Sequence, residues 1–409
     1  MDFLQIFYVG IYVVMIYLAL IWIILALKNK KNFITKPINE MFPALTFLVP
    51  AYNEEKNIGK CLNGLLSLDY PKDKLKIIVI NDGSKDRTGQ IAESFKKFGV
   101  MVLNKENGGK AVALNYGMDY VKTDLVGCMD ADSVPERDYL KIMMRHFRDP
   151  EVAAVTSAIK VNAMDSFFRR MQWAEYLITL GFRKLFSFLD CQFTIPGAGG
   201  IYKTNVLRKI GLFAPNNITE DMEIALRLHA GGYKIENSFN AFVVTNCPKT
   251  FRSLLRQRMR WYRGYIENYK DYRFMIFNPK YGNFGLFFAP MTIAWIGLIV
   301  TVLLLQTGLI FYDIAKSFLY WGLVNYQVVL PTKLYFLDFF AYDSLKLALS
   351  IHLVLGLFLT ILMVRKLSNV KFSNKKGLIT VYLFLYPYLF AFFWFMAILY
   401  TIFRVNKKW

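Results

Sequence analysis

The sequence predicts an α/β domain joined to a bundle of membrane helices. Two observations support this prediction. Long uncharged apolar segments lie near both ends of the 409-residue chain, and short apolar runs alternate with helical patterns between them. Hydrophobic residues make up 55% of the chain, more than an ordinary soluble protein carries. We therefore divide the chain into an N-terminal anchor, a central α/β domain and a C-terminal membrane region.

The N-terminal anchor is the segment 7–27, which holds no charged residue and is long enough to cross a bilayer. Four lysines follow it in a linker that ends at residue 37. Positive charge beside a membrane span marks its cytoplasmic side. We expect an uncleaved anchor in the plasma membrane, with the N-terminus outside and the central domain in the cytoplasm.

The C-terminal region, 284–409, is predicted to add further membrane crossings. We place spans at 284–311, 345–364 and 378–403, which would make the protein multi-pass. The last of them contains Pro387, so it is either one span or a re-entrant pair. The stretch 314–340 is aromatic and mostly apolar, and it is either an external loop or another membrane element.

The central domain, residues 38–250, shows the alternation of strand and helix patterns. Apolar runs predict strands at 45–50, 75–80, 100–103 and 124–129. The segments between them have helical spacing, at 56–68, 86–98 and 109–121. This alternation predicts a doubly wound parallel sheet with helices on both faces. In such sheets, ligands bind at the carboxyl ends of the strands.

Three aspartates lie just past predicted strand ends. Asp82, in the run IVINDGS, either contacts the base or ribose of a nucleotide or forms a turn. Asp130 and Asp132 are two residues apart, so both can approach one divalent cation that bridges diphosphate oxygens. The alternative for this pair is a polar junction between strand and loop.

Two further motifs open predicted helices. Lys110 ends the run NGGK, where it either meets a phosphate or lies on a surface turn. Thr219, Glu220 and Asp221 precede an amphipathic pattern. They either cap that helix or supply a general base that takes a proton from an acceptor hydroxyl.

Two basic and aromatic segments, 165–189 and 251–283, are predicted to contain amphipathic helices in the membrane interface. The second contains the run QRMRW. Either it contacts lipid only, or Arg260 also binds a diphosphate while Trp261 stacks on a sugar ring.

The remaining composition narrows the possible partners. The net charge of +20 fits cytoplasmic loops and anionic lipids, so we expect membrane lipids and no nucleic acid as partners. The four cysteines form no CxxC pair and the three histidines are not paired, which argues against a zinc site.

Taken together and in this order, VPAYNEE, INDGSKD, NGGKA, DAD, TED and QRMRW resemble the membrane-integrated family 2 glycosyltransferases. The arrangement is similar to that of poly-N-acetylglucosamine, cellulose, chitin and hyaluronan synthases. The resemblance implies a Rossmann-like GT-A fold and inverting, processive transfer from a UDP-sugar. UDP-GlcNAc and UDP-Glc are the candidate donors, and the membrane region would extrude the growing polysaccharide.

The resemblance also implies a role for each motif. The uridine would contact Tyr52, Glu54 and Asp82, and the phosphates would contact Lys110. Mg²⁺ or Mn²⁺ would be held by Asp132 together with Asp130, which also contacts the donor. The base would be Asp221, and the acceptor and diphosphate side would be formed by Glu220, Gln257, Arg260 and Trp261.

Some features depart from these synthases. An FxVTxK gating pattern has no clear match, PGAGGIYK lacks the cysteines of some relatives, and no cyclic-dinucleotide module is present. One alternative is a non-processive transferase that adds a single sugar to a lipid. A catalytically silent membrane scaffold is an alternative of another class, and it has no need for charged clusters at strand ends.

Overall fold

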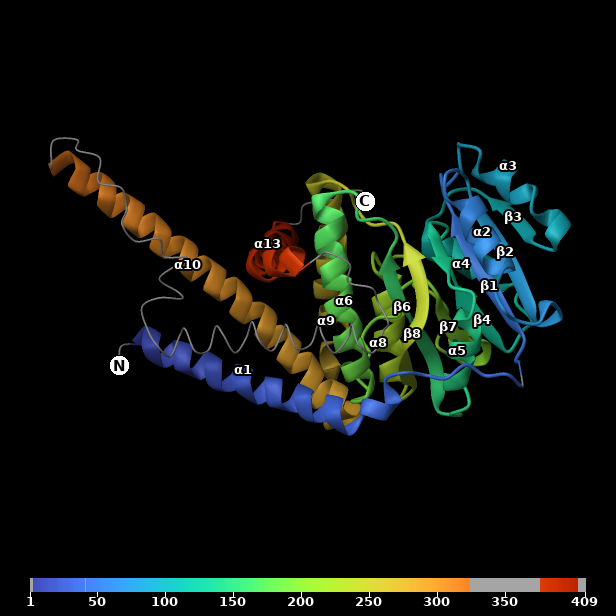
Figure 1. Ribbon diagram of the computed structural model, residues 1–409, viewed down its shortest axis with the longest axis horizontal. Coiled ribbons are helices and arrows are strands. Elements are labelled where there is room, and N and C mark those ends of the chain that lie inside the picture. The colour runs from blue at the N-terminus through green and yellow to red at the C-terminus, as the bar shows by residue number, and fades with distance from the viewer. Residues whose placement is uncertain (1–2, 41, 324–375, 404–409) are drawn as a thin grey trace.

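The computed structural model describes residues 3–40, 42–323 and 376–403 (Figure 1). The expected span 345–364 lies outside these residues. Only the first part of the stretch 314–340 lies within them, and it is helical as far as Leu323. The described residues form an α/β domain from which two long helices project.

One sheet of eight strands forms the core of the described domain, in the order β3-β2-β1-β4-β7-β6-β8-β5. The strands are β1 (Leu45–Ala51), β2 (Leu75–Asp82), β3 (Met101–Lys105), β4 (Leu125–Cys128), β5 (Ser133–Pro135), β6 (Val152–Val161), β7 (Gly200–Lys203) and β8 (Lys234–Thr245). Strands β3, β2, β1 and β4 are mutually parallel. The four strands predicted from the sequence are confirmed.

The parallel arrangement that the sequence predicts does not extend to the second half of the sheet. Strand β7 runs antiparallel to both β4 and β6, and β5 runs antiparallel to β8, whereas β6 and β8 are parallel. A mostly parallel sheet commonly takes up antiparallel strands at one side. The strand β7 has only four residues, so its direction depends on where the chain re-enters the sheet rather than on a local pattern.

Helices cover both faces of this sheet. The shorter ones are α2 (Ile58–Leu66), α3 (Thr88–Glu93), α4 (Lys110–Met118), α5 (Tyr139–His146), α7 (Thr204–Lys209) and α8 (Glu220–Ala230). Residues of α2 and α5 share one apolar cluster with the sheet, and residues of α4, α7 and α8 share another. The doubly wound arrangement is thus confirmed.

Two longer amphipathic helices, α6 (Phe167–Ser187) and α9 (Phe251–Asp271), occur where the sequence predicts them. Ser166 caps α6, and Thr250 with Ser253 forms a capping box at the start of α9. The apolar face of α6 packs on β6 and β8. Both helices therefore bury apolar residues against protein.

Three described helices are long and apolar enough to cross a membrane, which indicates a membrane protein. They are α1 (Phe3–Lys28), α10 (Ala289–Leu323, preceded by a π-helical turn) and α13 (Lys376–Ile402). Helix α13 continues through Pro387 without a break, so the re-entrant alternative is wrong. A proline inside an apolar helix is tolerated where neighbours pack against it, and α13 packs on α6 and α9.

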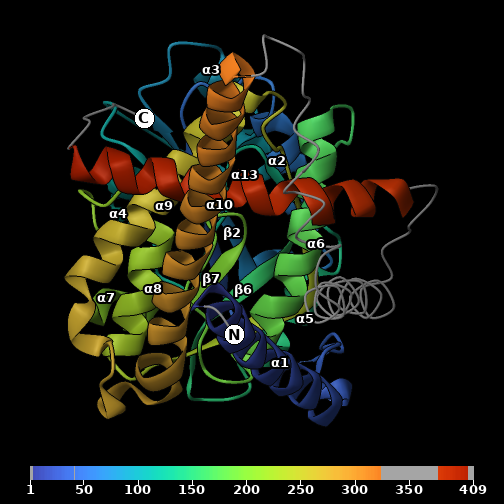
Figure 2. The same ribbon diagram turned by 90° about the vertical axis from the view of Figure 1, so that its left-hand side faces the viewer.

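The three apolar helices do not share one direction. Helices α1 and α10 project from the same side of the domain (Figure 1). Helix α13 is seen end-on in that view, and it crosses α10 in the perpendicular view (Figure 2). Phe393, Trp394 and Ala397 of α13 are buried against the α9 residues Leu254 and Met259. This packing places α13 directly beside the helix that carries the QRMRW run.

Candidate active site

The predicted aspartates meet at one edge of the sheet. Asp82 is the last residue of β2, and Asp130 and Asp132 follow β4. The loop with Tyr52 and Glu54 follows β1, which lies between β2 and β4 and is parallel to both. The carboxyl ends of these strands therefore bring all five residues to the same edge, as expected for such a sheet.

The carboxylate of Asp82 holds the glycine-rich loop in front of α4. It is 3% exposed and accepts bonds from the backbone N–H groups of Gly108 (3.0 Å) and Gly109 (2.8 Å). It also pairs with Lys105 Nζ at 2.6 Å. Gly109 has a φ of +88°, which glycine adopts without strain. Asp82 thus fixes the loop that delivers Lys110, and its contact with uridine remains a prediction.

Lys110 joins two motifs that are distant in sequence. Its Nζ lies 2.6 Å from Asp130 Oδ1 and 3.2 Å from Glu220 Oε1. Burial alone would lower the pKa of this ammonium, but Asp130 and Glu220 together raise it well above its usual range. Lys110 is therefore a permanent positive charge between the DAD run and the TED run.

Asp130 and Asp132 have the chemistry of a site for a hard divalent cation. Burial and the nearby negative charges of Asp130 and Glu54 raise the pKa of Asp132 to about 6. A hydrogen bond from the Ser133 hydroxyl to Asp132 Oδ1 lowers that pKa but does not cancel the rise. Carboxylates that repel one another in this way favour a cation between them. Within the described residues, no group of three or more His, Cys, Asp or Glu side chains forms a metal site. Two carboxylates fit Mg²⁺ or Mn²⁺ whose other ligands are substrate phosphates and water.

Asp221 lies in the first turn of α8 beside these charges. Burial and the neighbouring Glu220 raise its pKa to about 6, while Lys110 and Arg260 oppose that rise. A carboxylate with a pKa near 6 is ionised at neutral pH and still basic enough to accept a proton from a hydroxyl group. The position and chemistry of Asp221 suit the general base that the sequence suggests.

The capping interpretation of Thr219 is only partly correct. Thr219 occupies the N-cap position of α8, but its side chain makes no capping bond. Its hydroxyl instead accepts a bond of 2.9 Å from Asn268 Nδ2 on α9. The polar side chain is therefore committed to a neighbouring helix rather than to its own.

Helix α9 brings the predicted acceptor residues to the same region. Arg260 Nη1 donates to the carbonyl of Ile218 at 3.1 Å, just before the TED run. Gln257 Oε1 is buried and has no hydrogen-bond partner within the part of the chain that the structure describes. The ring of Trp261 lies 4.2 Å from the guanidinium of Arg258. Arg260 thus joins the charged cluster, whereas Gln257 and Trp261 occupy neighbouring positions on the helix.

Three contributors were not predicted from the sequence. Lys105 pairs with Asp82, and Arg258, which is fully buried, pairs with Glu175 of α6 at 2.7 Å. Gly197 lies directly against Lys110 and the DAD run. The glycine-rich run PGAGG was a usable signal for a close backbone approach. The ion pairs join segments 23 and 83 residues apart, which local patterns do not reveal.

We expect Gly197→Ala to weaken binding of the UDP-sugar donor that the sequence resemblance implies, by about tenfold or more. A Cβ at this position would collide with Lys110 Nζ and lie 2.8 Å from Asp130 Oδ1. The lysine end can move at little cost to stability, but it would lose its place between the two motifs. UDP-sugar titration and thermal unfolding test this expectation, and Gly59→Ala serves as the control because its Cβ would meet only Ile91 at 3.7 Å. Unchanged donor affinity would contradict the role of Gly197.

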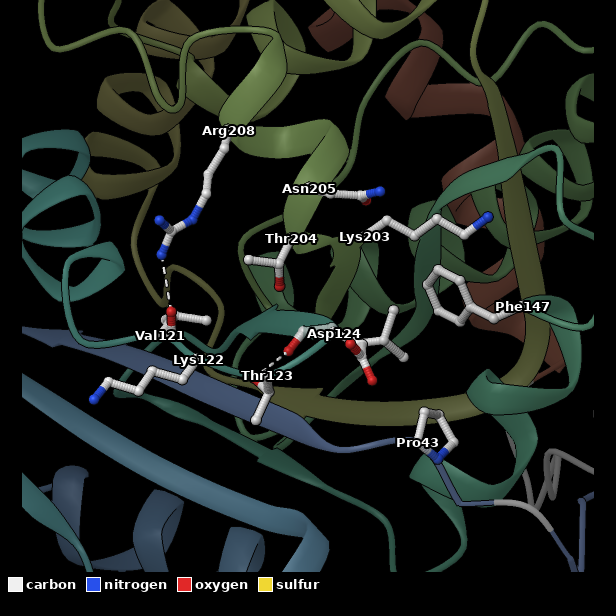
Figure 3. Close-up of a pocket in the computed structure, with 11 residues that line it drawn as sticks. Pro43, Val121, Lys122, Thr123, Asp124, Phe147, Lys203, Thr204, Asn205 and Arg208 are labelled. Atoms are coloured by element: carbon white, nitrogen blue, oxygen red, sulfur yellow. Dashed lines mark hydrogen bonds between the residues drawn. The ribbon is translucent and has the colours of Figure 1, made fainter.

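The cavity drawn in Figure 3 lies at a different place, with a volume of about 600 Å³. Its lining includes Pro43, before β1, and Asp124 and Leu125, at the start of β4. Arg208 points toward the carbonyl of Val121, to which it donates at 2.8 Å (Figure 3). None of the predicted site residues lines this cavity. It lies at the amino ends of these strands, opposite the carboxylates.

Comparison with known proteins defines the family. The family described as Glycosyl transferase family 2 matches residues 46–211, from β1 to just past α7. A poly-beta-1,6-N-acetyl-D-glucosamine synthase of Staphylococcus epidermidis is 30% identical over 303 residues, which cover 70% of this chain and 73% of the relative. The chain belongs to glycosyltransferase family 2. The expectation of a glycosyltransferase is therefore confirmed.

Further relatives and a solved structure are also similar to this family 2 glycosyltransferase. The synthases of the same name from Staphylococcus aureus are 33% identical over 224 residues, so the chain spans about half their length (54%). The structure of a mannosyltransferase from Pyrobaculum calidifontis, solved with GDP-Man and Mn²⁺, matches 97% of this chain and 96% of its own. Its TM-score is 0.57 at 18% sequence identity. This likeness confirms the predicted GT-A fold.

Proposed function

We propose that this family 2 glycosyltransferase is an inverting, processive polysaccharide synthase. It transfers a sugar from a UDP-sugar to the growing end of a polymer, which leaves through the membrane region. The observation that supports the proposed transfer step is the Lys110 ammonium, which pairs with Asp130 and with Glu220, the residue next to Asp221. The synthase names of the relatives favour UDP-GlcNAc as the donor and a GlcNAc polymer as the product.

The donor would lie at the carboxyl ends of β1, β2 and β4. Tyr52, which is 46% exposed, and Glu54 would contact the uridine, while Asp82 keeps the loop before Lys110 in place. A divalent cation held by Asp130 and Asp132 would neutralise the charge that builds on the departing UDP. The Lys110 ammonium adds a second positive charge on the diphosphate side.

The reaction needs one base, and Asp221 would supply it. Its carboxylate takes the proton of the acceptor hydroxyl as that oxygen attacks the anomeric carbon. The bond between the anomeric carbon and the diphosphate oxygen breaks, and UDP leaves with the electron pair. A single displacement of this kind inverts the configuration at the anomeric carbon. Glu220, paired with Lys110, would help to orient the diphosphate.

Helix α9 would hold the acceptor. Gln257 Oε1 has no hydrogen-bond partner among the described residues, so it can accept a bond from a sugar hydroxyl. Arg260 is fixed by the carbonyl of Ile218 near the diphosphate side. Trp261, held by Arg258 on one face, offers a ring on which a sugar can stack.

We expect Trp261→Ala to raise KM for an oligosaccharide primer by about tenfold, with a smaller effect on KM for the donor. Loss of the ring removes a stacking surface worth about 1 kcal/mol beyond its buried area, together with the apolar contact that it provides. Steady-state kinetics with each substrate varied in turn measure the effect, and Trp261→Phe should retain most of the primer affinity. A larger effect on the donor would remove Trp261 from the acceptor path.

Incubation of the full chain in lipid bilayers with a panel of UDP-sugars tests the proposed activity. UDP-GlcNAc, UDP-Glc and other UDP-sugars are compared by UDP release, with GDP-mannose included and the Asp221→Asn variant as blank. We expect one UDP-sugar, with UDP-GlcNAc favoured, to be turned over. Turnover of GDP-mannose alone, or of no donor, would contradict the proposal.

A further inference from the structure

One face of α9 contacts the loop that precedes Asp221. Residues four positions apart on a helix lie on the same face. Four residues spaced in this way touch the segment from Ile218 to Glu223: Arg260, Gly264 and Asn268 of α9, and Tyr272, which caps its C-terminal end. Helices α8 and α9 pack against each other. We call these four residues the α9 stripe.

Asn268 is the centre of the stripe. It is fully buried, and its Nδ2 donates to Thr219 Oγ1 at 2.9 Å. Its Oδ1 accepts a bond of 2.7 Å from Asn217 Nδ2, and Asn217 Oδ1 accepts the backbone N–H of Thr219 at 2.9 Å. Both the Nδ2 and the Oδ1 of Asn268 therefore make hydrogen bonds that hold the turn at residues 217–219. A buried amide satisfied in this way is costly to replace by an apolar group, because its partners lose their bonds.

Gly264 allows the close approach on which these bonds depend. A Cβ there would collide with Thr219 Oγ1 and lie 2.8 Å from Thr219 Cβ. One turn beyond Asn268, the hydroxyl of Tyr272 donates to Glu223 Oε1 at 2.6 Å. The contact thus extends from the turn before Asp221 into the first turn of α8.

We propose that Gly264, Asn268 and Tyr272 are positioning residues, which lock the Thr219–Asp221 turn to α9 so that base and acceptor residues move as one unit. The inference rests on the proposed function, in which Asp221 is the base and α9 carries the acceptor residues. A general base works only within hydrogen-bond reach of the proton it accepts. A displacement of about 1 Å can cost about 100-fold in rate. The stripe would keep that distance fixed while successive acceptors pass.

A double-mutant cycle tests the central contact. Asn268→Leu and Thr219→Val each remove one side of the 2.9 Å bond while keeping similar size. Each should lower kcat by about tenfold to 100-fold, with KM for the donor changed less than twofold. The double variant should lose little more than Asn268→Leu alone, because Asn268→Leu already breaks this bond together with the one from Asn217 Nδ2. Thr219→Ser keeps the hydroxyl and should recover most of the rate.

Two controls separate positioning from folding. Lys270→Ala is exposed on the same helix, outside the stripe, and should leave kcat unchanged. Tyr272→Phe removes a single hydroxyl and should lower kcat by a few-fold if Asn268→Leu does not fold. Positioning should also shift the acid limb of the kcat profile, because loosening α9 moves Arg260 relative to Asp221. A smaller folded fraction would instead lower kcat by the same factor at every pH and leave the midpoint of the acid limb unchanged.

Several outcomes would overturn the inference. In the first, the effects of Asn268→Leu and Thr219→Val on kcat are additive. In the second, Asn268→Leu behaves like Lys270→Ala, and in the third, Tyr272→Phe leaves kcat unchanged. The proposed function has a separate test, and it fails if Asp221→Asn retains turnover. An inactive Asp221→Asn variant beside normal stripe variants would reject the stripe alone.

Discussion

Replacing Asp221 with asparagine should lower kcat by about 10²- to 10⁴-fold, the range that general bases contribute. The amide has nearly the shape of the carboxylate but does not accept a proton. Binding of UDP should be nearly intact, because Lys110 keeps its contacts with Asp130 and Glu220. Single-turnover kinetics and UDP titration measure the two effects. Asp271→Asn, exposed at the end of α9, is the matched control, and retained turnover in Asp221→Asn would refute the base.

The same prediction has a pH signature. Burial and Glu220 raise the pKa of Asp221 to about 6, so the carboxyl is protonated below that pH. The rate should therefore fall as the pH drops through about 6 and level off above it. Asp132 has a raised pKa of about 6 as well, so kcat is followed at saturating donor and metal. The residual rate of Asp221→Asn should lack this fall at low pH. An equal fall in that variant would show that another group is the one that titrates.

Removal of the divalent cation should stop transfer, and Mg²⁺ or Mn²⁺ should restore it. Asp132→Asn should weaken Mn²⁺ binding by about tenfold or more, since one of the two proposed carboxylate ligands is lost. Electron paramagnetic resonance of added Mn²⁺ measures this without any turnover. The exposed Asp73→Asn variant is the control. Activity that survives chelation would reject the metal assignment.

The strand ends were predictable from the sequence because a buried parallel strand has a strong local pattern. The run LKIIVIND shows both the strand β2 and the polar residue at its end. Runs on parallel strands of one sheet end at the same edge, so the position of Asp82 and Asp130 at one edge followed from the predicted sheet. The antiparallel half did not follow, because β7 has four residues and its direction is set by distant contacts.

The connections within the site were not predictable. The sequence shows Lys110 opening a helix and Glu220 opening another, but their ion pair depends on how α4 and α8 pack on the sheet. Likewise, the spacing of Arg260, Gly264 and Asn268 is typical of any amphipathic helix face. Only the three-dimensional arrangement shows that this face meets Thr219. Residue types were visible in the sequence, whereas their partners depend on tertiary packing.

Product length measured against conversion is the most direct test of polymer synthesis. The full chain is placed in vesicles with radiolabelled UDP-GlcNAc, and products are sized while most of the donor remains. The proposed mechanism predicts long chains at low conversion, because each enzyme extends one polymer before starting another. A product that stops at one sugar on a lipid would contradict processive synthesis and support the single-addition alternative.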